Sequence, residues 1–98
     1  MYVLAIVRYR KSLDHIDAHL EAHRAYLRDL KAKGVVLASG PMDPRNGGMI
    51  LLRVPDDAPD AVLDGIRDND PFVQAGVAQY ELQRWQVVMG REGLDQLP

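Results

Sequence analysis

Cysteine is absent from the 98 residues. Disulfides, thiolate nucleophiles and thiolate metal ligands are therefore excluded, and the composition suits a reducing compartment such as the cytoplasm. A strong positive charge is also lacking, because 12 Lys and Arg residues oppose 14 Asp and Glu residues, for a formal net charge of −2. Without a positive field, we expect no binding to nucleic acid or to an anionic membrane surface.

A long hydrophobic run is missing as well. The apolar stretch after Met1 ends at residue 7 and has no basic region before it, so it is too short for a signal sequence or a membrane span. The length fits one domain, without internal repeats or linkers. We expect a single cytoplasmic domain over residues 1–98, with a core at about 2–88 and a loose tail at 90–98.

The apolar residues that are present recur with the periods of strands and helices, and glycine and proline clusters separate the segments. The order β-α-β-β-α-β is that of the ferredoxin-like sandwich, an α+β fold with a four-stranded antiparallel sheet. The expected strands cover 2–9, 35–39, 49–54 and 78–88, and the expected helices cover 13–33, 59–67 and a short segment after Asp70.

The first two strands are apolar on both of their faces. In residues 2–7 both alternating sets of side chains are apolar, and the same holds for residues 35–39. Two helices cover one face of the sheet, and no further element is left to cover the other. A second subunit packed sheet against sheet is the simplest cover, so we predict a homodimer through the open face.

The helix expected at 13–33 carries all three histidines. Leucine and isoleucine recur along one of its faces, and His23 stands where this repeat requires another apolar residue. His19 is rotated to the flank of that face and His15 to the polar side, so we interpret both as surface residues. The i, i+4, i+8 spacing of the histidines is typical of metal ligands. Two histidines four residues apart could bind zinc, but the sequence offers no evident third ligand, so we expect no metal site.

His23 has two interpretations. A histidine on an apolar helix face is more often a structural core residue than a catalyst. Alternatively it is a general acid or base, which requires a partner, most simply a carboxylate, on its other ring nitrogen. Asp70 is a candidate partner, but an Asp before Pro71 is also a helix N-cap signal that implies no chemistry.

Ser39, Gly40 and Pro41 also have two interpretations. They form either a strand end with a turn or a place where backbone and hydroxyl groups approach a ligand closely, and Gly47-Gly48 allows the same choice. A nucleophilic Ser39 is disfavoured because its surroundings do not resemble a nucleophile elbow. Four arginines could bind an anionic substrate, although most should be solvated: Arg8, Arg45, Arg53 and Arg84.

Four segments resemble the YCII-related (YciI-like) family in order and spacing. They are Ala-His-Arg-Ala-Tyr-Leu at 22–27, the segment from Gly34 that ends in Ser-Gly-Pro at 39–41, Gly47-Gly48, and Asp-Pro-Phe-Val-Gln-Ala-Gly-Val at 70–77. The resemblance covers roughly residues 2–88. It implies a dimeric α+β barrel built from ferredoxin-like subunits.

The resemblance also implies that His23 and Asp70 are the family's proposed active-site dyad, close to the turn at 39–41. One branch of the family is associated with dehydrochlorination of a chlorinated hydroxyquinol, and fold relatives include muconolactone isomerase. Some members carry an arginine three residues before the histidine. This chain has Leu20 there and so lacks that ligand for a substrate anion.

We therefore expect a small cofactor-free enzyme. His23 would be the general acid/base, Asp70 would orient it, and Ser39, Gly40 and Pro41 would contact a small aromatic or enol-type substrate. The reaction would be an elimination, such as dehydrochlorination, or an isomerisation. The alternative is a non-catalytic dimeric module that binds a small ligand, with His23 and Asp70 as a structural pair. A cofactor-free monooxygenase acting on quinols would use the same site for different chemistry.

Overall fold

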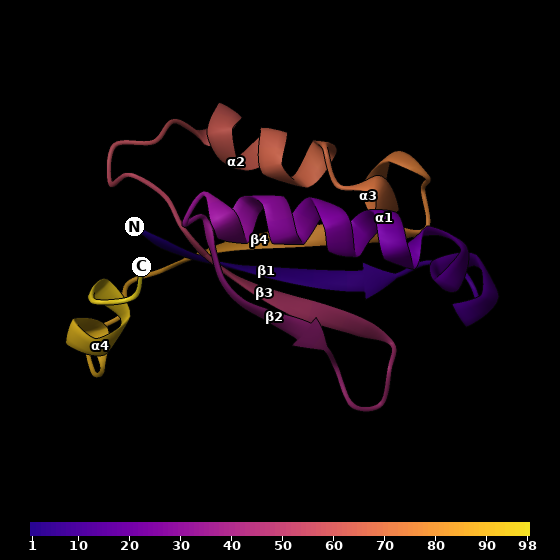
Figure 1. The fold of residues 1–98 in the computed structure, drawn as a ribbon, viewed down its shortest axis with the longest axis horizontal. Coiled ribbons are helices and arrows are strands. Elements are labelled where there is room, and N and C mark those ends of the chain that lie inside the picture. Colours follow the sequence, from indigo (N-terminus) through magenta and orange to yellow (C-terminus); the bar gives the residue numbers. More distant parts are fainter.

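The computed structural model describes residues 1–98 as four strands and four helices (Figure 1). The predicted order β-α-β-β-α-β is confirmed, with α3 as the short helix that begins at Pro71. In chain order the elements are β1 (Tyr2–Tyr9), α1 (Leu13–Ala32), β2 (Val36–Pro41), β3 (Gly47–Arg53), α2 (Asp60–Asp68), α3 (Pro71–Gln74), β4 (Ala78–Trp85) and α4 (Arg91–Asp95).

The four strands form one antiparallel sheet in the order β2-β3-β1-β4. This is the ferredoxin-like arrangement predicted from the sequence, with β1 in the centre and β2 and β4 at the edges. The sequence misplaced several strand boundaries, and β3 begins at Gly47, two residues before its expected start, so that Gly47 and Gly48 belong to the strand and not to the turn. The second strand includes Gly40 and Pro41, because an edge strand tolerates a proline that cannot donate a hydrogen bond. The last strand ends at Trp85 rather than at residue 88, because β1 has no partner residue beyond that point.

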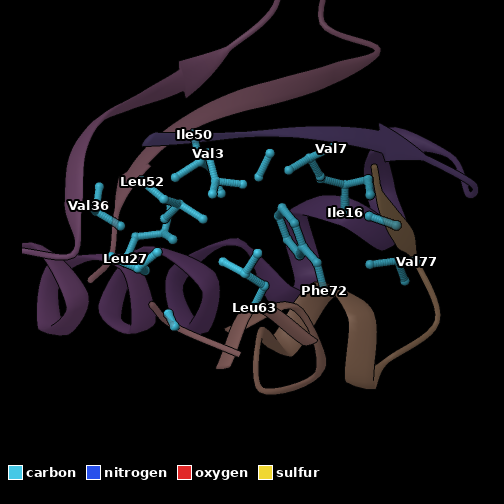
Figure 2. Packing of buried hydrophobic residues seen from close by; sticks show 14 residues of the cluster. Val3, Val7, Ile16, Leu27, Val36, Ile50, Leu52, Leu63, Phe72 and Val77 are labelled. Carbon is cyan, nitrogen blue, oxygen red and sulfur yellow. The ribbon is translucent and has the colours of Figure 1, made fainter. Parts of the chain in front are cut away.

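Three helices cover one face of the sheet. Figure 1 shows α1, α2 and α3 on the same side, with α1 running along the strands. On this side β1 contributes Val3, Ala5 and Val7, which are 0%, 0% and 2% exposed. Figure 2 shows Phe72 pointing from α3 toward β1, in a cluster that also includes Ile16 of α1. This packed layer fixes the position of α1, and with it the position of His23.

The opposite face has no helical layer. Residues directly opposite each other in the ladder point to the same face, so Leu4 lies beside Leu51 and Ile6 beside Met49. Met49 is 41% exposed and Trp85, on the same face of β4, is 47% exposed. The two apolar faces expected for the first strand are therefore present, and one of them is open in the single chain.

The C-terminal residues 90–98 were expected to form a loose tail, and this expectation is wrong because they contain α4. The Tyr2 hydroxyl donates a hydrogen bond to the carboxylate of Asp95, and Nη1 of Arg53 donates to the carbonyl oxygen of Leu94 at 3.2 Å. Tyr2 and Arg53 are paired across β1 and β3. These contacts fasten α4 at one end of the open face.

No helix of the chain combines the length and the apolar character needed to cross a membrane.

Candidate active site

His23 and Asp70 lie in direct contact although 47 residues separate them. His23 is on the inner side of α1, and Asp70 is the residue that precedes α3. Nδ1 of His23 lies 2.8 Å from Oδ1 and 2.8 Å from Oδ2 of Asp70. The packing of α1 against α3 thus brings together the two residues that the sequence singled out.

Asp70 is the one charged residue that is fully buried, with 0% of its surface exposed. Its Oδ1 accepts a hydrogen bond from the backbone N–H of Phe72 at 2.9 Å, and its Oδ2 accepts one from the hydroxyl of Tyr80. Together with His23, these donors offset the loss of water around the carboxylate. The N-cap role and the histidine-partner role, which the sequence presented as alternatives, are filled by the same carboxylate at the same time.

This arrangement assigns the proton on the imidazole of His23. An ionised carboxylate only accepts hydrogen bonds, so Nδ1 must carry the hydrogen that faces Asp70. Nε2 then carries the lone pair, and it has no hydrogen-bond partner within the protein. Because no buried side-chain nitrogen or oxygen lacks a partner, Nε2 must be accessible at the surface of the cavity that His23 lines.

Aromatic rings fix the orientation of the imidazole. The ring of His23 stacks on that of Phe72, with centroids 3.9 Å apart and planes inclined by 6°. Tyr9 meets the same phenyl ring edge-on, with centroids 6.0 Å apart and an interplanar angle of 85°. Since the His23 side chain is 12% exposed, the ring is held firmly while a small part of it reaches solvent.

Tyr80 is the site residue that sequence reasoning missed. Burial, followed by the negative charge of Asp70 and the hydrogen bond to it, raises the pKa of the Tyr80 phenol above its ordinary value. Burial is also the main cause that raises the pKa of Tyr26 to about 12, with a further contribution from Asp70. Both phenols therefore remain protonated at neutral pH. The sequence did contain a signal for Tyr80, because the alternation of side chains along the last strand assigns it to one face. In the sheet it lies opposite Val7, on the covered face.

A cavity of about 220 Å³ lies between α1 and the β2–β3 hairpin, and His23 is part of its wall. Ser39, Gly40 and Pro41 line the same cavity, so the structure places this predicted segment near the imidazole. Gly48 of the Gly47-Gly48 pair lines it too. A Cβ atom at Gly47 would lie 2.1 Å from the carbonyl oxygen of Val7, which accounts for that glycine by close backbone approach alone.

The arginines divide between this cavity and the outer surface. Arg45 lines the cavity, and so does Arg24, which the sequence analysis did not select. The sequence signal that could have drawn attention to Arg24 was its position directly after His23. The other three arginines considered are engaged elsewhere: Arg8 with Glu81, Arg84 with Asp60, and Arg53 with the Leu94 carbonyl.

The three histidines of α1 have different surroundings. His15 is exposed, and its Nδ1 lies 2.8 Å from the hydroxyl oxygen of Ser12. His19 is partly exposed and does not line the cavity. Both therefore differ from His23, as the helical periodicity predicted. No group of three or more His, Asp or Glu side chains is arranged to hold a metal ion.

Comparisons with known proteins agree with the fold. The model of the YCII-related domain family matches residues 1–86. Among solved structures, the chain is similar to 5-chloro-2-hydroxyhydroquinone dehydrochlorinase (TftG) from Burkholderia phenoliruptrix AC1100 in complex with 2,5-dihydroxybenzoquinone. The TM-score is 0.71 at 27% sequence identity, over 90% of this chain and 96% of that chain. No curated protein sequence matches.

Proposed function

This chain belongs to the YCII-related family, and we propose that it is a small enzyme that uses His23 and Asp70 for general acid/base chemistry. The observation that carries the proposal is the buried carboxylate on Nδ1 of His23, which leaves Nε2 as a free lone pair at a cavity. A base oriented in this way can take a proton from a bound ring and return it later. Elimination and isomerisation both use this step.

In an elimination, Nε2 of His23 removes a proton from the substrate, and the electrons of that bond form a new double bond. The carbon–chlorine bond breaks at the same time or afterwards, and chloride leaves with its electron pair. Asp70 stabilises the imidazolium formed in the first step, and the proton then passes to water. In an isomerisation the same nitrogen returns the proton to a different atom. Neither route transfers electrons to a second molecule, so we propose that no cofactor takes part.

The proposed substrate is a small aromatic or enol-type compound. Support comes from the similar dehydrochlorinase, which acts on a chlorinated hydroxyhydroquinone and was captured with a dihydroxybenzoquinone. The cavity wall offers hydrophobic side chains together with Ser39, Gly40 and Pro41, which we propose as substrate contacts. The absence of cysteine fits the cytoplasm, the location that we propose for the reaction.

The test is chloride release from 5-chloro-2-hydroxyhydroquinone by the purified protein. His23→Ala should lower kcat by roughly 10²- to 10⁴-fold, which is the usual contribution of a positioned general base. His19→Ala is the matched control, because it removes an imidazole from the preceding turn of α1 outside the cavity, and it should leave turnover unchanged. Equal turnover by wild type and His23→Ala would reject the assignment.

A homodimer is part of the proposal. Leu4, Ile6, Met49, Leu51 and Trp85 share the open face of the sheet, and the chain supplies no helix to cover them. An apolar surface of this kind is stabilised when a second copy packs on it, face to face. The family's dimeric α+β barrel is the arrangement that we propose.

One observation favours a second candidate function. Asp70 caps α3 and satisfies three donors, so the His23–Asp70 pair has a structural use without any catalysis. In that case the chain is a non-catalytic dimeric module, and the cavity binds a small ligand without changing it. The two candidates differ in turnover, because a binding module retains ligand but releases no chloride.

A further inference from the structure

The cavity beside His23 is lined by positive charge alone. Among its 14 lining residues, Arg24 and Arg45 carry a permanent positive charge and His23 can acquire one, whereas no Asp or Glu is present. The chain as a whole has a formal net charge of −2. Asp17 lies behind the wall and offsets part of the charge of Arg45, but the groups that face the cavity are positive, which favours an anionic occupant.

Arg45 is held in place by Asp17, and Tyr9, which also lines the cavity, lies close enough to raise the pKa of the guanidinium further. Its Nη2 donates to Oδ1 of Asp17 at 2.6 Å, which ties the loop between β2 and β3 to the first half of α1. A guanidinium has five N–H donors in a planar fork, and this ion pair uses one of its nitrogens. The side chain is thus positioned before a ligand arrives, and it can still form a bidentate contact with an oxyanion.

Arg24 takes part in no ion pair. The nearby carboxylate of Glu21 is bonded instead to Arg28, at 2.9 Å. Several other arginines are ion-paired, as Arg84 is with Asp60, and Arg10 and Arg53 are hydrogen-bonded to Gln79 and to the Leu94 carbonyl. An unpaired guanidinium in the wall of a half-hydrophobic cavity is available for a ligand, and His23, the proposed base, lines the same cavity.

The volume of the cavity suits a ligand with about one ring. A dry protein cavity of about 150 Å³ is large enough for benzene. The volume of about 220 Å³ here leaves room for a ring with polar substituents, and seven of the 14 lining residues are hydrophobic, Phe72 and Leu27 among them. Apolar walls suit the faces of a ring, and the arginines suit a charged substituent on its edge.

We propose that the ligand of this cavity is a single-ring organic anion, and that Arg24 and Arg45 form its anion-binding clamp. The negative group is a carboxylate or an ionised enol or phenol, which share the oxyanion chemistry that a guanidinium recognises. The proposal rests on the proposed function for the role of His23. It adds that the clamp stabilises the charge that develops on the ring when His23 removes a proton.

The experiment compares matched anionic and neutral rings by calorimetry and by NMR titration of the wild-type protein. Benzoate should bind roughly ten- to a hundredfold more tightly than benzamide, which is the scale of charge-assisted hydrogen bonds. Arg24→Gln and Arg45→Gln should each reduce this preference by about tenfold while leaving benzamide binding unchanged. Arg28→Gln is the control, because Arg28 lies one turn further along α1 and does not line this cavity. A second arm with 2,5-dihydroxybenzoquinone distinguishes an ionised enol from a carboxylate as the preferred group.

Equal binding of benzoate and benzamide, a preference unaffected by both arginine substitutions, or no binding of either anion at millimolar concentration would overturn the clamp. Retained benzamide binding and an unchanged NMR spectrum show that a variant is folded. His23→Ala separates this inference from the proposed function, because it should slow chloride release by roughly 10²- to 10⁴-fold and keep the preference for benzoate. If His23→Ala retained turnover, the catalytic assignment would fail while the anion preference still stood on its own test.

Discussion

The two faces of the sheet differ in how far one chain completes them. On the covered face Val3, Ala5 and Val7 are almost fully buried beneath the helices, whereas Leu4 and Ile6 on the other face are only partly buried. The same strand supplies both sets, so the difference arises from the neighbouring elements and not from local sequence. Helices α1, α2 and α3 cover one face, α4 contacts only one end of the other, and the rest of that face is suited to a partner.

The proposed chemistry lies entirely on the covered face. His23 and Asp70 meet between α1 and α3, and the cavity is enclosed by elements of the helical layer and the edge of the sheet. Packing on this face therefore serves both stability and function, because it holds the imidazole in one orientation. The open face has no such site, and changes on it should alter association more than chemistry.

The largest expected effect on stability comes from neighbouring leucines that point to opposite faces. Leu52 is 0% exposed on the covered face, whereas Leu51 lies partly exposed beside Leu4. Leu52→Ala should lower the free energy of unfolding by about 2–5 kcal/mol at every protein concentration, because it leaves a cavity in the core. Leu51→Ala should lower the free energy of unfolding of the dissociated chain by less than about 1 kcal/mol. Where the dimer forms, the loss of stability should depend on protein concentration.

Chemical denaturation of the two leucine variants at several protein concentrations measures this difference. Similar losses for both, without any dependence on concentration, would contradict the distinction between a completed face and an open one.

A charge on the open face should separate the subunits. Ile6 lies opposite Glu81 in the ladder, so a lysine at position 6 has an acidic neighbour in the single chain but is buried in a dimer. Ile6→Lys should weaken dimerisation by at least about tenfold and leave the fold intact. Sedimentation equilibrium measures the change, with Val62→Lys on the exposed side of α2 as the control. A wild type that sediments as a monomer at micromolar concentration would refute the dimer.

The smallest expected effect is an alkaline loss of stability on the covered face. Tyr26 donates to the carbonyl oxygen of Ile66 at 2.7 Å, and burial raises the pKa of its phenol to about 12, above the ordinary value of about 10. Above pH 10 the unfolded chain releases this proton while the folded chain keeps it, so stability is complete below pH 10 and declines as pH rises toward 12. Denaturation across this range should show a shallower decline for Tyr26→Phe. Identical slopes for variant and wild type would remove Tyr26 as a contributor.

Much of this arrangement could be predicted from local pattern. The first strand has its predicted bounds, and α1 ends one residue before the prediction, where Gly34 adopts a φ of 77° that glycine tolerates. Helical periodicity assigned His23 to the inner face, and the Asp-Pro pair located the start of α3. These features depend on neighbours in sequence, which a single chain displays directly.

The features that the sequence did not predict depend on distant partners. Tyr80 reaches Asp70 only because β4 pairs with β1. Arg45 was one of four candidate arginines, and its ion pair with Asp17 is the part that the sequence did not predict. The tail of the chain forms α4 where Tyr2 of the first strand offers a hydrogen bond to Asp95. Each contact joins segments far apart in the chain, and periodicity can assign a residue to a face but does not identify its partner.

The most direct test of the central claim is nitrogen NMR of histidine-labelled protein, with the His23 signals assigned from the His23→Ala variant. In the neutral ring of His23, Nδ1 should carry the proton and Nε2 the lone pair. Addition of 2,5-dihydroxybenzoquinone should shift the Nε2 resonance and leave the signals of His15 and His19 in place. A proton on Nε2, or an Nε2 resonance that does not respond to the ligand, would contradict a base that Asp70 orients toward the cavity.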